Sequence, residues 1–345
     1  MATRLNRSTR IWRLAKDLGI RTVTDPVSDI LNLCEKRIKK MLKDATDCRS
    51  LSSFLDWIAG NLGTSFEEIR SDDDFLRIKK KYLALGEKIF ATLEQEFSDE
   101  VLGITYRLSH RESWEPQFVS VIDCRGGNSI RAYYTKWHEV AHLLILTDQS
   151  RLCFRRTEHL PDKDPEEVLI DRIAGKFGFY PPFIKPHIKG EISFEQIETL
   201  RQALCPEASN LASLIGFVKA WPEPGLLVLC KEGLKKSESR RLSIQRSFDF
   251  STLPVPVLRA IKVTPNEAAK EQGILIHENM RIPERSVIYA VHNSGEAESA
   301  EAMEDLSWWE SSSGAILPKQ KISVKAKDFW GDTYALIIPK FRSRS

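Results

Sequence analysis

The feature that most constrains this chain is the segment at residues 138–142, which reads His-Glu-Val-Ala-His and is an H-E-x-x-H motif. No glycine or proline interrupts residues 130–146, and apolar residues flank the motif, a pattern that predicts a buried helix. Histidines four positions apart share one helix face, so both imidazoles can bind a single metal ion. The glutamate is then placed to take a proton from water that the metal activates. The motif predicts a zinc peptidase site with His138 and His142 as metal ligands and Glu139 as general base.

The alternative is a plain structural role for the same residues. Two core histidines bonded to backbone carbonyls, with Glu139 paired to an arginine, would leave the same pattern. A motif that fixes only three positions does occur by chance. Histidine is scarce here, with 7 in 345 residues, which makes a chance match less frequent. We therefore expect the metal site.

The composition is that of an ordinary globular protein of two or three domains. With 345 residues the chain can bury a substantial core. A net charge of +3 is too small to argue for nucleic-acid binding by itself. No apolar run approaches the roughly 20 residues that a membrane helix needs, so we expect no membrane partner.

The cysteine pattern argues against a cysteine-ligated metal site or a redox motif. The 6 cysteines are dispersed, and no two of them form a C-x-x-C pair. The N-terminus carries charges where a secretion signal would have its apolar stretch. We therefore expect a cytoplasmic protein with free thiols.

Charge is unevenly distributed along the chain. Residues 1–21 are mostly basic in their charges, whereas residues 294–314 contain acidic residues and no basic ones. We interpret both segments as solvated surface, and the acidic one as a loop.

The N-terminal region, residues 1–98, is predicted to be helical. Asp25 followed by Pro26 is typical of an N-cap and first helical position, and apolar spacing continues the helix to residue 42. Two further helices are expected at residues 51–62 and 74–97.

Residues 99–190 are predicted to form a zincin-like core with a small sheet. Residues 101–108 and 117–122 have the alternation of strands, and they precede the motif helix. A strand beside that helix could hold an extended peptide by added-strand pairing.

Residues 191–222 are predicted to form a helix pair. Ser193 with Gln196 makes a capping box before the first helix, and Cys205-Pro206 interrupts the pattern. A helix-turn-helix that contacts DNA is one interpretation, although most helix pairs are not DNA readers.

Residues 223–345 are predicted to form a β-rich module, which could serve as a sensor. The expected strands lie at residues 226–229, 255–263, 286–292, 322–327 and 333–338. The fold class as a whole is α+β.

A catalytic zinc site needs a third protein ligand, and three carboxylates are candidates. Asp148 has the spacing of an extended motif, but Ile145 stands where that motif needs glycine. Glu167 is explained by local structure, because it follows Asp164 as the N3 residue of a capping box. Asp171 borders the apolar side of the same helix, where either a metal or an arginine would satisfy it.

The sequence resembles the ImmA/IrrE family of metallopeptidases. Matching positions surround the motif and continue in the following helix: Arg131, Tyr134, Thr135, Asp171, Ala174, Phe177 and Pro181-Pro182. Four positions depart from the family pattern. Asp171 stands where glutamate is usual, Trp137 where a small residue is usual, and Phe179 and Tyr180 where the family has small and polar residues.

The resemblance implies that His138, His142 and Asp171 bind Zn²⁺ and that Glu139 is the general base. It also implies a cytoplasmic regulatory endopeptidase whose protein substrate is a transcriptional repressor, cut in a stress response. Two other functions remain open: a DNA-binding regulator, and a toxin-antitoxin or defence component with a structural or vestigial metal site. The oligomeric state is not predicted.

Overall fold

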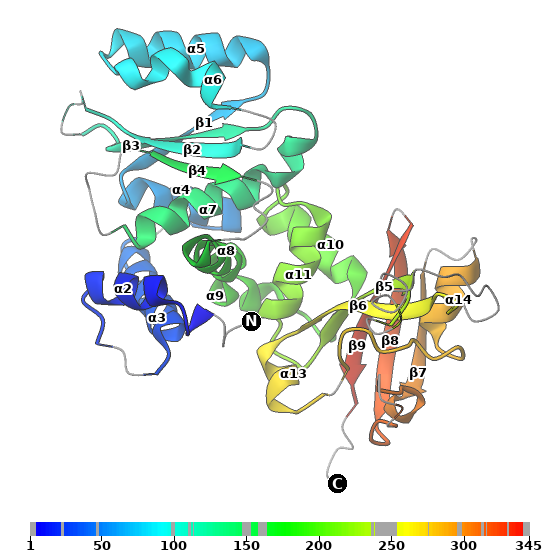
Figure 1. Cartoon of the computed structure of the whole chain (residues 1–345). Helices are drawn as coiled ribbons and strands as arrows, with labels where there is room; N and C mark the ends of the chain where they lie inside the picture. The colour runs from blue at the N-terminus through cyan, green and yellow to red at the C-terminus, as the bar shows by residue number, and fades with distance from the viewer. Residues whose placement is uncertain are drawn as a thin grey trace, which may run out of the picture. The chain divides into compact units, whose positions relative to one another are not determined.

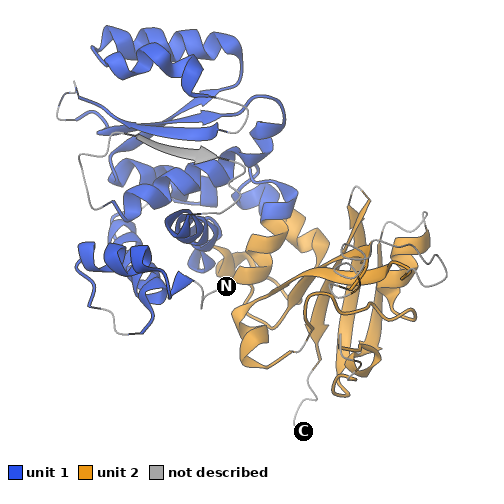
Figure 2. Ribbon diagram, viewed as in Figure 1, with its two compact units in different colours: residues 1–183, 200–212 blue, residues 184–199, 213–345 orange. Residues whose placement is uncertain are grey.

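The computed structural model describes most of the chain. It covers residues 5–340 except 22–23, 46–47, 98–100, 110–111, 113, 147–152, 158–163, 236–237, 239–253, 275, 295–298, 312–313, 315 and 330, and it gives only the backbone of 153–157. The chain divides into two compact units, shown in Figure 2. Unit 1 comprises residues 1–183 and 200–212, and unit 2 comprises residues 184–199 and 213–345.

Unit 1 contains a mixed four-stranded sheet. Its strands are β1 (Thr64–Ile69), β2 (Val101–Arg107), β3 (Phe118–Asp123) and β4 (Cys153–Thr157), in the order β1-β3-β2-β4. β1 runs parallel to β3, whereas β2 is antiparallel to both β3 and β4.

Helices cover both faces of this sheet (Figure 1). α5 (Asp72–Ala84), η1 (Lys88–Thr92) and α6 (Leu93–Glu96) lie on one face, and α4 (Leu51–Asn61) and α7 (Ala132–Leu144) lie on the other. The core on the α5 side is apolar and includes Phe75, Ile78, Ile104, Val119 and Val121.

Other helices of unit 1 precede or follow the motif helix. They are α2 (Thr9–Asp17), α3 (Pro26–Leu42), α8 (Pro165–Phe177) and the single turn α9 (Pro181–Ile184). α8 packs against α7, and α2 and α3 pack against α8. The predicted start of α3 is confirmed, because the Asp25 carboxylate accepts a hydrogen bond from the Ser28 amide at 2.9 Å.

α7 crosses the core of unit 1, as its uninterrupted apolar sequence predicts. Every residue of this helix except Tyr134 and Lys136 is buried. The short η2 (Gly126–Arg131) leads into α7. At its other end the Arg37 guanidinium donates to the Leu144 carbonyl, which satisfies one of the acceptors that a helix C-terminus leaves open.

Unit 2 is built on a five-stranded antiparallel sheet. The strands are β5 (Leu226–Gly233), β6 (Val257–Pro265), β7 (Ser299–Asp305), β8 (Lys321–Phe329) and β9 (Asp332–Pro339), in the order β6-β5-β9-β8-β7. α14 (Val287–Ser294) packs against β8, and α13 (Glu267–Glu271) follows β6. The turn η5 (Leu306–Trp308) follows β7. The α+β fold class, with a helical N-terminus and a β-rich C-terminal module, is therefore confirmed.

Two expectations for the N-terminal region are wrong. The long helix predicted for 74–97 ends at Ala84, because Gly86 adopts a left-handed φ of 86° that stops the helix. The region also contributes β1 to the sheet. Glu67 and Glu68 make this segment look unlike a strand in the sequence. Both form ion pairs with basic residues, among them Lys81, whose Nζ lies 2.5 Å from Glu67 Oε1.

Two expectations for the C-terminal module are also wrong. The strand predicted at residues 286–292 is the helix α14, whose apolar residues Ile288 and Val291 lie on one face. The acidic loop contains β7, where Glu301 lies opposite Lys325 of β8. Cross-strand pairing of opposite charges gives this acidic sequence a place at the edge of a sheet.

The predicted helix pair is confirmed as α10 (Phe194–Leu204) and α11 (Asn210–Ala220), with η3 (Lys185–His187) before it. The Ser193 hydroxyl caps α10 by accepting from the Gln196 amide at 3.2 Å. α11 is largely buried and carries one basic residue, Lys219, which gives no support for a DNA-reading surface. DNA contact stays a prediction. Within the described ranges, no helix combines the length and the apolar character that crossing a membrane requires.

Candidate metal centre

α7 holds His138 and His142 side by side. Their ring centroids are 5.0 Å apart, as expected for residues one helical turn apart. The two side chains are only 3% and 8% exposed, so their polar ring nitrogens lie inside the protein. Buried polar atoms need a hydrogen-bond partner or a metal.

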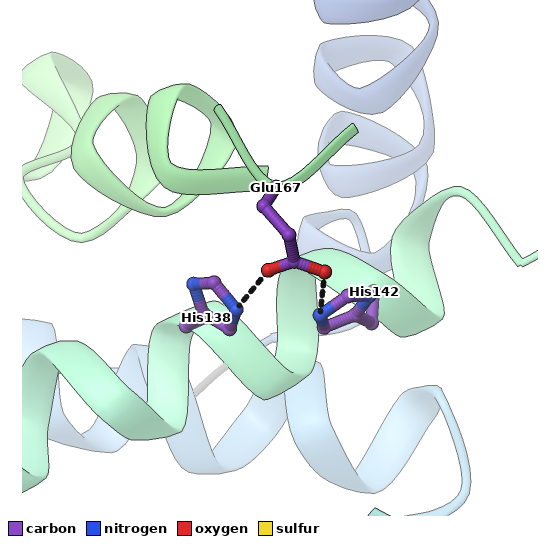
Figure 3. A group of neighbouring side chains, drawn as sticks. All are labelled: His138, His142 and Glu167. Atoms are coloured by element: carbon purple, nitrogen blue, oxygen red, sulfur yellow. Dashed lines mark ion pairs between the residues drawn. The ribbon is translucent and has the colours of Figure 1, made fainter. Parts of the chain in front are cut away.

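α8 brings a carboxylate to this pair of rings (Figure 3). Glu167 Oε2 lies 3.2 Å from His138 Nε2, and Glu167 Oε1 lies 3.7 Å from His142 Nε2. One ligand atom from each of the three residues can be chosen so that all lie within 4.8 Å of one another. A single carboxylate therefore faces both imidazoles from the neighbouring helix.

The local sequence explains why Glu167 reaches this place. Asp164 is the N-cap of α8 and accepts a hydrogen bond from the Glu166 amide at 3.0 Å, and Pro165 occupies the first helical position. The Glu167 side chain is thus in the first turn of α8, where this helix meets α7. The sequence predicts a capping role for Glu167, whereas the structure places its carboxylate against the two histidines.

The three side chains fit a zinc ion by their chemistry. Two imidazole nitrogens and one carboxylate oxygen form the donor set of many catalytic zinc sites. The Glu167 side chain is 27% exposed, so the group is accessible to solvent on its side. The geometry is that of a candidate metal site.

Asp171 lies beside the histidine pair but at a different ring atom. Its Oδ1 is 3.2 Å from His138 Nδ1, whereas Glu167 approaches Nε2 of the same ring. The structure therefore brings Glu167 next to both histidines and Asp171 next to one of them. The two carboxylates are four residues apart, so the helical spacing that placed Asp171 toward α7 applies equally to Glu167.

Glu139 is fully buried between α7 and the sheet. Its Oε2 accepts a hydrogen bond from the Thr105 hydroxyl of β2 at 2.7 Å. Gly103 of the same strand lies so close that an added Cβ would stand 3.2 Å from Glu139 Oε1 and 2.8 Å from Thr135 Cγ2. The sheet thus holds one oxygen of the predicted base by a hydrogen bond and leaves little space beside the other.

Amide hydrolysis also needs a group that stabilises the oxyanion, and the sequence offers Tyr134, His159, Arg172 and Tyr180 near the motif without favouring one. The two tyrosines have structural contacts. The Tyr134 hydroxyl donates to the Asp171 carbonyl at 2.7 Å, which ties α7 to the middle of α8. Tyr180 stacks on Phe54 with ring centroids 5.5 Å apart, and burial raises the pKa of its hydroxyl. Arg172 is partly buried on α8, whereas His159 and Asp148 lie outside the described residues.

Further contacts hold α8 in place. The Tyr133 hydroxyl donates to the Gly178 carbonyl at 2.6 Å. Lys176 bonds Glu35 of α3 at 2.8 Å, and this ammonium lowers the pKa of the Glu35 carboxyl. Arg10 of α2 forms an ion pair with the N-cap Asp164.

The fold and the site together describe an α+β protein with an H-E-x-x-H helix and a candidate His-His-Glu metal centre. No family model matches the chain, and no curated protein matches it in sequence.

Proposed function

We propose that this protein is a zinc-dependent endopeptidase. The observation that carries the proposal is the convergence of His138 and His142 with the Glu167 carboxylate, all within 4.8 Å. Glu139 is on the same helix as the two histidines, in the position of the general base of H-E-x-x-H peptidases.

In this proposal Glu167 is the third ligand and Asp171 orients His138. A carboxylate that accepts from Nδ1–H of an imidazole fixes the tautomer that leaves Nε2 to bind a metal. The support for that role is the 3.2 Å contact between the Asp171 carboxylate and His138 Nδ1. The aspartate of the ImmA/IrrE-like motif is thus a neighbour of the ligand set.

The residues of the site have separate roles in amide hydrolysis. A bound zinc ion lowers the pKa of water and polarises the scissile carbonyl. Glu139 accepts the proton of the attacking water and delivers it to the leaving amine. An extended peptide would pair with β4, and the support for this is that β4 is an outer strand of the described sheet and packs beside α7.

The resemblance to ImmA/IrrE peptidases extends the proposal to a regulatory role. A transcriptional repressor cut under stress is the substrate that it suggests, and unit 2 would be the sensor. The support for this finer assignment is the set of motif positions around His138 and in α8.

The test combines metal content with cleavage. Purified wild type should contain about one zinc per chain by elemental analysis and should cut members of a random peptide library, read by mass spectrometry. Glu139→Gln should keep the zinc and lose at least about a hundredfold in cleavage rate, and His142→Ala should lose both. Wild type without stoichiometric zinc, or Glu139→Gln with undiminished cleavage, would refute the proposal.

A further inference from the structure

The face of the unit 1 sheet that meets α7 carries buried hydroxyl groups on three adjacent strands. Thr64 of β1, Ser120 of β3 and Thr105 of β2 are 4%, 0% and 1% exposed. Thr105 and Ser120 are direct partners in the antiparallel pair of β2 with β3. Valine or alanine would fill such positions without the cost of burying a polar group. The presence of three hydroxyls here therefore suggests that they form hydrogen bonds that apolar residues could not make.

The three hydroxyls form a hydrogen-bonded chain that ends on Glu139. Thr64 Oγ1 lies 3.2 Å from Ser120 Oγ, and Ser120 Oγ lies 2.7 Å from Thr105 Oγ1. Thr105 Oγ1 lies 2.7 Å from Glu139 Oε2. The chain runs across the sheet from β1 to the carboxylate on α7.

Counting protons gives this chain a direction when Glu139 is a carboxylate. Each hydroxyl has one proton, and Thr105 donates its proton to Glu139. The contact between Ser120 and Thr105 must then be donated by Ser120. Thr64 can complete the sequence toward Ser120, and its other acceptor, the Ser65 carbonyl, is more distant at 3.4 Å. The aligned hydroxyls thus act on one oxygen of Glu139.

Gly103, two residues before Thr105 on β2, leaves room for this arrangement. A Cβ at this position would lie 2.8 Å from Thr135 Cγ2, closer than real Cβ atoms come, and 3.2 Å from Glu139 Oε1. A larger residue would push α7 away from β2, whereas glycine lets α7 approach closely enough for Thr105 to reach Glu139 Oε2.

We propose that Thr105 is a positioning residue for Glu139, with Ser120 and Thr64 holding the Thr105 hydroxyl in its donating orientation. The proposal rests on the proposed function, in which Glu139 is the general base. By fixing Oε2 against the sheet, Thr105 sets the rotamer of Glu139 and so the place of Oε1. The Thr105 hydroxyl accepts one hydrogen bond from Ser120 and donates another to Glu139, so its rotation is restricted and the donating orientation is favoured.

The experiment measures binding of acetohydroxamic acid to the full-length Co²⁺-loaded protein by visible absorption. A hydroxamate chelates the metal and hydrogen-bonds to a carboxylate beside it, so its affinity reports how Glu139 is held. Thr105→Val keeps the shape and removes the hydroxyl, and Thr105→Ser restores the hydroxyl. Thr264→Val makes the same change at a buried strand threonine of unit 2 and is the matched control.

Thr105→Val should raise the Kd of the hydroxamate about ten- to hundredfold, the range for losing one hydrogen bond to a charged group. Thr105→Ser and Thr264→Val should stay within about threefold of wild type, and Co²⁺ affinity should be unchanged in all three. Ser120→Ala should give a smaller loss. That variant carries the test if circular dichroism finds Thr105→Val unfolded.

Four results would overturn the proposal in distinguishable ways. If folded, Co²⁺-loaded Thr105→Val binds the hydroxamate as tightly as wild type, Thr105 does not position Glu139. If Thr105→Val no longer binds Co²⁺, Thr105 supports the whole helix and again has no specific role in positioning Glu139. Unchanged hydroxamate affinity in Glu139→Gln removes the placement of Glu139 at the metal. Wild type that takes up no Co²⁺ refutes the proposed function itself.

Discussion

His138 is the residue on which the geometry of the candidate site converges. Its two ring nitrogens face two different carboxylates, Glu167 at Nε2 and Asp171 at Nδ1. A neutral imidazole has one donor nitrogen and one acceptor nitrogen, so the two carboxylates cannot have equivalent roles. A carboxylate that takes the Nδ1 proton leaves the Nε2 lone pair for a metal, which separates a ligand from an orienting group.

Asp171→Asn tests this division of roles. The amide keeps the size of the side chain but removes its charge, so zinc affinity should fall about ten- to hundredfold and zinc should still bind. Competition with a chromophoric chelator measures the Kd. Glu167→Gln is the matched variant on the same helix and should lose stoichiometric zinc. The reverse order of severity would make Asp171 the ligand, as the motif resemblance implies.

The sequence was sufficient to predict that His138 and His142 share one face of α7, but it was not sufficient to decide whether Glu167 or Asp171 lies against both rings. The spacing of His138 and His142 fixes their shared helix face whatever surrounds them. Glu167 and Asp171 are also one turn apart, and both face α7, so only the axial position of α8 decides which carboxylate meets both rings. That position depends on tertiary contacts such as Tyr134 with the Asp171 carbonyl, which leave no local pattern.

Among the elements, α14 departs most from its sequence pattern. Residues 287–291 are rich in β-branched and aromatic side chains, which favour a strand. Two side chains cap this helix. The Ser286 hydroxyl accepts from the Ile288 amide at 3.2 Å, and Glu304 of β7 adds a cap from outside the segment, because its Oε1 accepts from the Val287 amide at 2.7 Å and from the Ser286 hydroxyl at 3.0 Å. A cap delivered by a distant strand cannot be predicted from the local sequence, whereas the cap of α3 at Asp25 can.

Glu304 should make the stability of unit 2 depend on pH. Burial raises the pKa of this carboxyl, partly opposed by its bonds to Val287 and Ser286. The folded state therefore holds a proton that the unfolded state releases, so the stability from this group is present below the unfolded pKa and falls as pH rises through the folded pKa. Glu304→Gln should remove that fall.

Chemical denaturation between pH 4 and pH 8 measures the effect, and the difference between wild type and Glu304→Gln should shift in favour of the variant as pH rises. Glu304→Ala also removes the cap and should be about 1–2 kcal/mol less stable than Glu304→Gln at all pH values. A pH-independent difference between wild type and Glu304→Gln would contradict the burial argument.

For the whole molecule, the division into two compact units confines the effect of a metal. All three residues of the candidate site belong to unit 1. Because a ligand stabilises only the structure whose opening disrupts its site, zinc should stabilise unit 1 by about 2.7 kcal/mol at a hundredfold excess over Kd.

Hydrogen-deuterium exchange with zinc and after chelation tests this confinement. Protection should rise in α7 and α8 when zinc is present and should stay unchanged in β5 to β9. The variant His142→Ala should show no zinc-dependent protection in either unit. An equal zinc effect on the sheet of unit 2 would contradict the assignment of the site to unit 1 alone.

The anchoring of α8 has a practical consequence for anyone who shortens the chain. Arg10 and Lys176 tie the two ends of this helix to α2 and α3, through Asp164 and Glu35. Segments more than a hundred residues upstream of the motif therefore set where the carboxylate of Glu167 stands. A fragment that begins near α4 would keep the whole H-E-x-x-H motif and Glu167 but would lose both ion pairs that hold α8.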